Sequence, residues 1–72
     1  MLRKADLRDA NLTGADLSSV GLRGDNLTNA ILDNAILQYT NLGGANLSRA
    51  SLKGAKLRDA GFSNRKTDGI RF

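Results

Sequence analysis

The side chains in this 72-residue sequence that could do acid, base or metal chemistry are its seven carboxylates, all of them aspartate. Histidine, cysteine and glutamate are absent from the sequence, so the usual nucleophiles, imidazole bases and thiolate ligands are missing. Catalysis by carboxylates alone needs a second titratable group in a cleft, and a hard cation needs about six converging oxygens. We therefore expect no catalytic, cofactor-binding or metal-ligating residues, and we predict that the protein is not an enzyme.

Lysine and arginine number eleven and give the chain a net charge of +4. No basic residue lies between residues 24 and 48, so the positive charge gathers toward the two ends of the sequence. The C-terminal part of this charge predicts a basic patch, formed by Arg49, Lys53, Lys56 and Arg58. Phosphate groups could bind there, but no aromatic side chain is interleaved for base stacking. Weak binding of nucleic acid or an anionic surface is therefore an alternative function, and we do not expect nucleic acid as the main partner.

Leucine recurs every five residues from Leu2 to Leu57, and Phe62 takes the next position. All alanines share one register, two residues before a leucine or, for Ala60, before Phe62. Such regularity indicates an internal repeat whose apolar residues face one continuous core. We predict that the core contains the central residue of each unit, namely Leu7, Leu12, Leu17, Leu22, Leu27, Leu32, Leu37, Leu42, Leu47, Leu52, Leu57 and Phe62.

A period of five matches neither an α-helix nor a flat strand. Within each unit the order is alanine inward, a polar residue outward and leucine inward, followed by two more polar residues. The first three residues alternate as in a strand, and the last two must turn a corner. Glycine, asparagine and aspartate are frequent at these corners, as turns require. A chain that turns every five residues must coil, and its successive circuits can pair as parallel strands.

The units ADLRD, ANLTG, ADLSS, ANLSR, ASLKG and AKLRD resemble the pentapeptide-repeat family, whose pattern is alanine, aspartate or asparagine, leucine and two variable residues. The resemblance covers residues 1–64 as thirteen consecutive units. It implies an all-β fold, a right-handed quadrilateral parallel β-helix with four five-residue faces per coil, in which residues twenty positions apart stack. The chain then forms about three coils, and residues 65–72 make a C-terminal cap or tail.

Three large apolar side chains in the segment ILDNAILQYT, residues 31–40, lie outside the predicted core. In the implied coil, Ile31 and Ile36 hold outward positions on neighbouring faces, and Tyr39 holds a corner. These side chains either favour strand structure and pack locally on the wall, or they form a contact site for a protein partner. We retain Ile31, Ile36 and Tyr39 as candidate contact residues.

The sequence also allows expectations about the ends of the coil and about one buried position. After residue 64 the repeat is lost, and Ile70 and Phe72 are available to cover the last leucine layer as a cap. A β-helix exposes strand edges where it stops, so the chain is either a segment of a longer protein or an end-to-end homodimer. Asp25 occupies an alanine position, where we expect either bonds to backbone amides at a distorted corner or a side chain that swings outward.

The function that fits these features is a non-enzymatic structural or protein-interaction module, a rigid β-helical scaffold for a protein partner. The resemblance adds an alternative, a regulator directed at DNA gyrase that imitates the acidic surface of duplex DNA, whereas this chain is basic. No apolar run is long enough to span a membrane. Because the family is abundant in bacteria, the resemblance favours a cytoplasmic location, with the periplasm and the thylakoid lumen as alternatives.

Overall fold

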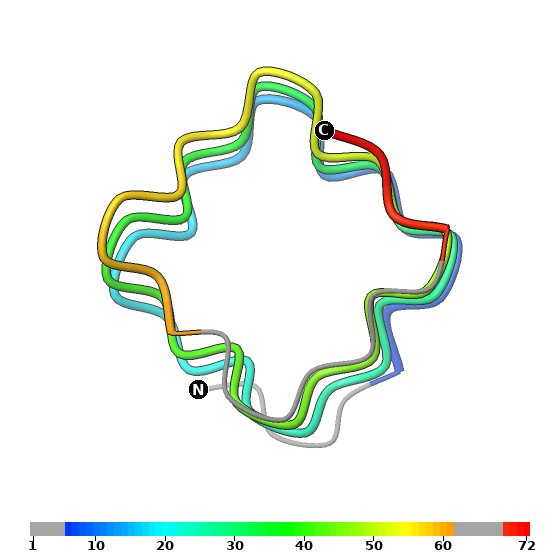
Figure 1. The fold of residues 1–72 in the computed structure, drawn as a ribbon, viewed down its shortest axis with the longest axis horizontal. Helices are drawn as coiled ribbons and strands as arrows, with labels where there is room; N and C mark the ends of the chain where they lie inside the picture. The colour runs from blue at the N-terminus through cyan, green and yellow to red at the C-terminus, as the bar shows by residue number, and fades with distance from the viewer. Residues whose placement is uncertain (1–5, 62–68) are drawn as a thin grey trace.

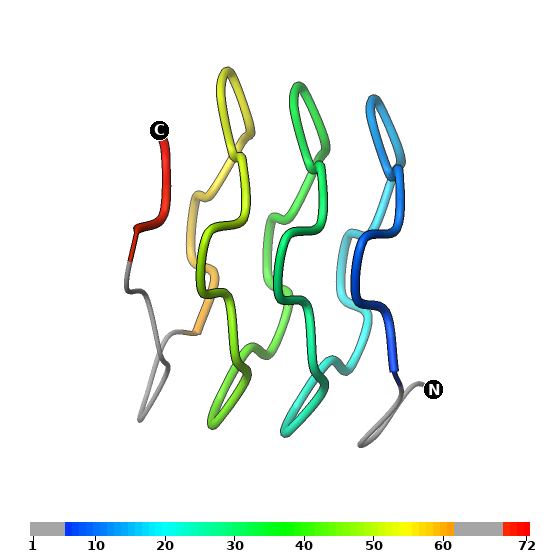
Figure 2. The ribbon, with the colours of Figure 1, turned by 90° about the vertical axis from the view of Figure 1, so that its right-hand side faces the viewer.

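The backbone of the computed structural model, which describes residues 6–61 and 69–72, follows a square outline with four stepped sides (Figure 1). Successive circuits lie side by side along one axis (Figure 2), and the molecule measures 23 × 22 × 17 Å. Within the described residues there is no helix and no extended strand, because each side of the square contributes only an isolated bridge. The fold is therefore a coil of short bridged segments and turns.

Parallel bridges between residues twenty positions apart set the register of the coil. Ile31, for example, pairs with Asn11 on one side and with Ser51 on the other. Backbone hydrogen bonds run in both directions between circuits, because the Leu32 N–H donates to Ser51 O at 2.7 Å and the Ser51 N–H donates to Ala30 O at 3.0 Å. Each circuit therefore contains twenty residues, and four pentapeptides make the four sides.

We call the four sides of the coil walls A to D. The residue before each central leucine lies in the middle of the outer face of its wall, and the two residues after it form the corner that leads to the next wall. The central residues are Leu7, Leu27 and Leu47 in wall A, Leu12, Leu32 and Leu52 in wall B, Leu17, Leu37 and Leu57 in wall C, and Leu22 and Leu42 in wall D.

Every corner within residues 6–61 is a four-residue turn in which a leucine carbonyl accepts a hydrogen bond from the N–H three residues later, as between Leu32 and Ala35 at 3.0 Å. The third residue of each turn has a φ of 58° to 74°, as a type II turn requires. Glycine adopts this conformation without steric cost, and it occupies the position in several units. Tyr39, with a φ of 61°, and Arg49, with a φ of 59°, adopt it against the steric preference of their side chains.

The core is a column of stacked leucine and alanine layers inside the square. Its middle is sealed from solvent, whereas Leu7, Leu12, Leu17 and Leu57, in the outer layers of the described coil, are only half-buried. Phe62, the last predicted core residue, lies outside the described residues. The fully buried leucines are Leu22, Leu27, Leu32, Leu37, Leu42 and Leu47, and Leu52 is 2% exposed.

Two polar residues occupy inward alanine positions, Asp25 and Thr40, and both are fully buried. The Thr40 hydroxyl donates to Leu17 O at 2.6 Å. At Asp25 the corner is regular, since Gly24 has a φ of 74° and the Asp25 N–H donates to Leu22 O at 3.1 Å. The expectations of a distorted corner and of an outward-swung Asp25 side chain are therefore both wrong, because the turn tolerates the buried side chain without rearrangement.

Polar side chains in the middle of the walls bond to the turn that follows them. Asn26 Oδ1 accepts from the backbone N–H and the hydroxyl of Thr28, at 3.1 and 2.6 Å. Asp16 makes the same contacts with Ser18, and the bond from the Ser18 hydroxyl lowers the pKa of Asp16. These local hydrogen bonds favour the turn conformation after each leucine.

Asp6 and Arg8 on wall A form the strongest of these local pairs. The guanidinium Nε and Nη2 of Arg8 donate to the two carboxylate oxygens of Asp6 at 2.8 and 2.7 Å, which holds the pKa of Asp6 at about 2. The same contact raises the pKa of Arg8. Both side chains are exposed, so the pair orders a surface turn and builds no catalytic dyad.

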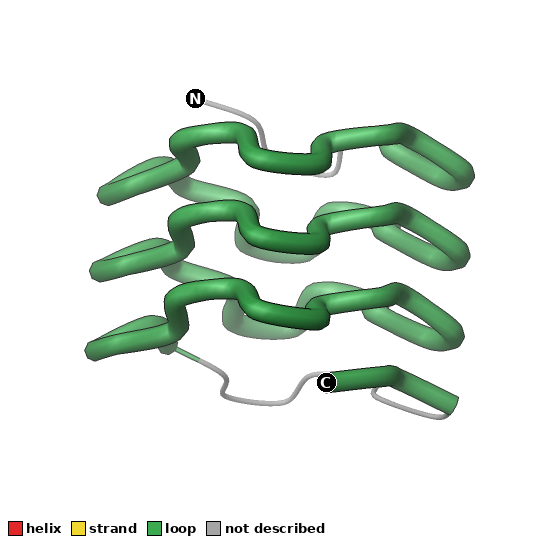
Figure 3. The backbone as a smooth tube through the Cα atoms, turned by 90° about the horizontal axis from the view of Figure 1, so that it is seen from above, coloured by secondary structure: helices red, strands yellow, loops and turns green. Residues whose placement is uncertain are grey.

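Residues 69–72 return to the register of the coil next to wall B (Figure 3). Arg71 pairs with Ser51, and the Leu52 N–H donates to Arg71 O at 2.7 Å. Ile70, one of the two residues expected in a cap, is half-buried and packs against the core cluster. Phe72, the other, is 71% exposed. Residues 69–72 thus add a further row to wall B.

The positive φ at Tyr39 generates a prediction about stability. Tyr39→Gly should raise the free energy of unfolding by about 0.5 to 1 kcal/mol, because glycine adopts the left-handed conformation without strain. The matched control is Gln38→Gly, one residue earlier in the same turn, where φ is not positive and glycine should destabilise the fold. Urea denaturation followed by circular dichroism measures both variants, and equal losses in the two would contradict the strain at Tyr39.

The Asp6–Arg8 pair predicts a pH effect of defined sign. A depressed folded-state pKa means that the pair stabilises the protein fully above about pH 4, and that this stabilisation is lost as the pH falls through about 2. Arg8→Gln should move the Asp6 pKa upward toward its ordinary value of 3.8. A carbon-13 NMR titration of the side-chain carboxyl measures the change, with Arg58→Gln on the opposite wall as the control. An Asp6 pKa that stays unchanged in Arg8→Gln would refute the assignment.

Candidate functional site

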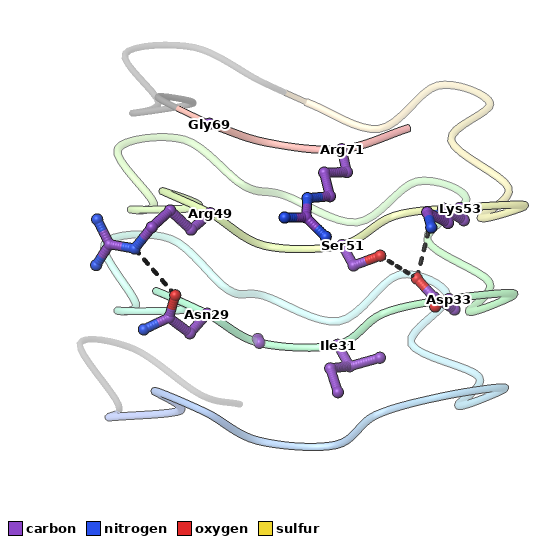
Figure 4. Close-up of a pocket in the computed structure, with 9 residues that line it drawn as sticks. Asn29, Ile31, Asp33, Arg49, Ser51, Lys53, Gly69 and Arg71 are labelled. Atoms are coloured by element: carbon purple, nitrogen blue, oxygen red, sulfur yellow. Dashed lines mark hydrogen bonds between the residues drawn. The ribbon is translucent and has the colours of Figure 1, made fainter.

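A shallow groove of about 410 Å³ lies on the outer face of wall B (Figure 4). Its lining comes from consecutive circuits of the coil and from the returning residues 69–72, so residues far apart in the sequence meet on it. We call it the basic groove, and the residues that line it are Asn29, Ala30, Ile31, Asp33, Arg49, Ser51, Lys53, Gly69 and Arg71.

Among the described residues, three cations and one carboxylate give the lining of the basic groove a net charge of +2. Arg49 comes from the corner before wall B, Lys53 from the turn after it, and Arg71 from the middle of the wall next to Ser51. Within residues 6–61 and 69–72, the ion pairs are Asp6–Arg8 and Arg58–Asp59, and neither involves a groove residue. The positive charge of the groove is therefore not neutralised by the described part of the chain.

Hydrogen bonds hold the polar side chains of the groove in place. The Ser51 hydroxyl donates to Asp33 Oδ1, and the backbone N–H of Lys53 donates to the same oxygen at 3.2 Å. Arg49 Nε donates to Asn29 Oδ1 at 3.0 Å, which orients the guanidinium at its corner. The terminal guanidinium nitrogens of Arg49 and the Lys53 ammonium make no hydrogen bond within the described residues, so they are available to a ligand.

Of the three candidate contact residues, the structure places only Ile31 in the basic groove, where it is 39% exposed. Ile36 lies around the corner on wall C, half-buried, paired with Lys56. Tyr39 is 61% exposed at the far corner of wall C. The turn at Asp33 separates Ile31 from the other two, so the three side chains do not form one continuous patch on a single wall.

The predicted basic patch is divided in the same way. Arg49 and Lys53 line the groove, whereas Lys56 and Arg58 belong to wall C, and Arg58 Nε lies 3.8 Å from Asp59 Oδ2. Arg71 joins the groove, although the sequence-based patch did not include it. Its position was readable from the spacing, because residue 71 lies twenty positions after residue 51 and so continues the same outward column.

Neither a cluster of metal ligands nor a membrane-spanning helix is found among the described residues. Within residues 6–61 and 69–72, no group of three acidic side chains gathers closely enough to hold a metal ion. In those residues no helix has the length and the apolar character needed to cross a membrane.

Known structures resemble this coil closely. A pentapeptide repeat protein from the thylakoid lumen of Arabidopsis thaliana is 31% identical, with a TM-score of 0.91 over 96% of this chain and 48% of that one. Rfr23, from the cyanobacterium Cyanothece 51142, is 30% identical with a TM-score of 0.71, over 99% of this chain and 63% of its own. A pentapeptide repeat protein from Nostoc is 32% identical with a TM-score of 0.63, over 93% and 60%.

The present chain thus spans about half to three fifths of the solved proteins that it matches. Among curated proteins, no match was found. The family model of pentapeptide repeats matches eight copies, over residues 1–29 and 26–64, which together cover most of the sequence. The square coil of Figure 1 is accordingly a right-handed quadrilateral β-helix, and the chain belongs to the pentapeptide-repeat family.

Proposed function

We propose that this chain is a non-enzymatic scaffold, a rigid β-helix of about three coils that binds a protein partner through the basic groove of wall B. The observation that carries the proposal is the meeting, on one wall, of an exposed isoleucine with three cations, none of which forms an ion pair with a carboxylate of the described residues. Apolar side chains next to arginine are typical of the residues that contribute most to protein interfaces. The groove therefore has the composition of a contact site.

The backbone beneath the groove supports a binding role because it is held from both sides. The Ile31 N–H donates to Ala10 O at 2.8 Å, and Ile31 O accepts from the Leu12 N–H at 2.7 Å. On the other side the Leu32 N–H donates to Ser51 O at 2.7 Å. A wall fixed in this way loses little conformational entropy when a partner binds, which favours affinity.

The chemistry of the groove supports a role without catalysis. Asp33 is the one carboxylate that the described residues contribute to it, and Asp33 Oδ1 accepts from the Ser51 hydroxyl and from the Lys53 N–H. A general base needs a proton acceptor aimed at a substrate, and this oxygen is turned toward the wall's own donors. The groove is therefore better suited to recognition than to reaction.

The competing functions receive less support from the same wall. Imitation of duplex DNA needs an acidic surface, whereas the lining of the basic groove carries a net charge of +2. Nucleic-acid binding would use aromatic side chains for stacking, but Tyr39 lies on another wall and the exposed Phe72 is not among the residues that line the groove. The end-to-end homodimer is a separate proposal, and it is supported by the half-buried leucines of the first coil.

As for location, we propose a bacterial cytoplasm, with the thylakoid lumen of the Arabidopsis neighbour as the alternative.

The scaffold proposal predicts that capture of a partner depends on Ile31. Ile31→Asp should abolish capture, because a carboxylate would replace the apolar contact, and the fold should persist because Asp16 occupies the equivalent outward position of another unit. The matched control is Ile36→Asp on wall C, which should retain the partner. The full chain is immobilised, lysate of the source cells is passed over it, and bound proteins are quantified by mass spectrometry. A set of bound proteins that Ile31→Asp leaves unchanged would contradict the proposal.

A further inference from the structure

Apolar surface and positive charge follow one another along the axis of the coil on wall B. Ile31 pairs with Ser51 on the next circuit, and Ser51 pairs with Arg71 on the circuit after that. Figure 4 shows Arg49 and Lys53 on either side of this column, at the level of Ser51. A ligand that lies along the column therefore meets one apolar side chain first and a triangle of cations next.

The excess of cations in the groove favours a negatively charged ligand. Asp33 is the one acidic residue among the described residues of the lining, and its Oδ1 accepts from the Ser51 hydroxyl and the Lys53 N–H. Neither Arg49 nor Arg71 forms an ion pair with a carboxylate of the described residues. A concave wall with one sign of charge attracts ligands of the opposite sign and orients them as they arrive.

The spacing of the column matches that of an extended peptide. Successive circuits of a β-structure lie about 4.8 Å apart, which places the backbone of Arg71 roughly 10 Å from that of Ile31. The Arg71 side chain points back along the column toward Ser51, which shortens the span from Ile31 to the guanidinium (Figure 4). Two or three residues of an extended chain, at about 3.3 Å each, bridge that span.

We propose that the basic groove binds an extended acidic peptide segment of a partner protein. An apolar side chain of the segment packs on Ile31, and carboxylates two to three residues further along pair with Arg71, Arg49 and Lys53. This inference deepens the proposed scaffold function, because it rests on the same wall and names the chemistry of the partner. A free phosphate would leave Ile31 uncovered, and a nucleic acid would find no aromatic side chain among the residues of the groove.

The test is a fluorescence anisotropy titration of the full chain with a synthetic labelled peptide. The probe contains one leucine followed by three glutamates, between glycine and serine spacers. Two control peptides replace the glutamates by glutamines or the leucine by serine. We expect the probe to bind, and we expect either replacement to weaken binding at least 3-fold. Equal binding of the glutamine peptide would overturn the inference, because the cations would then contribute nothing.

Variants of the protein assign the binding to the groove. Arg71→Gln, Arg49→Gln and Lys53→Gln should each weaken binding of the probe about 3- to 10-fold. Lys56→Gln and Arg58→Gln remove the same charge from wall C and should change it less than about 2-fold. If the variants on wall C weaken binding as much as those on wall B, the attraction is non-specific and the inference fails.

A variant that should bind the probe more tightly provides a test that misfolding cannot imitate, because misfolding would only weaken binding. Asp33→Asn removes the one negative charge of the groove while retaining an Oδ1 that accepts from Ser51 and Lys53. It should tighten binding of the acidic probe about 2-fold. A loss of binding in Asp33→Asn would contradict the role that we assign to charge.

Competition experiments and the lysate capture separate this inference from the scaffold proposal. Inorganic phosphate or a short DNA duplex that displaces the probe at equal concentration would assign the groove to those ligands and overturn the peptide. Absence of probe binding, together with lysate capture that still depends on Ile31, would overturn the acidic peptide alone. Binding of the probe with capture that is indifferent to Ile31 would support the peptide and refute the proposed contact in the cell.

Discussion

A single hydrogen bond repeated at every corner supports the rest of this structure: a leucine carbonyl accepts from the N–H three residues later. The turn that it closes uses two residues and each wall segment uses three, so each unit is five residues long. The next inward side chain therefore always enters the same narrow interior. Alanine fits where the turn delivers the chain to the core, and leucine fills the middle of each wall. The requirement for a positive φ follows from the same turn, and it is met even by Tyr39 and Arg49.

The inward positions carry the stability of the coil, so the outward positions can differ in chemistry. In wall A, Asp6 and Asn26 use their oxygens on their own turns, through Arg8 and Thr28. Wall B follows the same pattern at Asn11, whose Oδ1 accepts from Thr13, but the next circuits place isoleucine, serine and arginine in its middle column. Among the described residues, the cations around this column outnumber the carboxylates. That excess of positive charge distinguishes a surface suited to binding from one that only stabilises turns.

The sequence alone predicted the repeat and the buried leucines, because a period of five with leucine in one register is compatible with few other folds. It did not predict the groove, because the column of Ile31 and Ser51 is completed by Arg71, which lies beyond the last recognisable unit. The candidate basic patch grouped Arg49 with Arg58, which the corner at Gly54 places on different walls. That patch also left out Arg71, because this residue follows the last recognisable unit. Asp25 was misjudged because a regular turn can hold a buried carboxylate without distortion.

The bridging of residues twenty positions apart also governs how such a coil can change by insertion during evolution. An insertion of one pentapeptide between Ile31 and Arg49 would keep every leucine inward and every corner closed, so the fold would survive. All later outward residues would nevertheless advance by a quarter turn, and the cations would move from wall B to the neighbouring wall, away from Ile31. An insertion of four pentapeptides would restore the angular alignment while moving the cations one further circuit away from Ile31. The length of an insertion, counted in units, therefore selects which surfaces coincide, independently of the stability of the core.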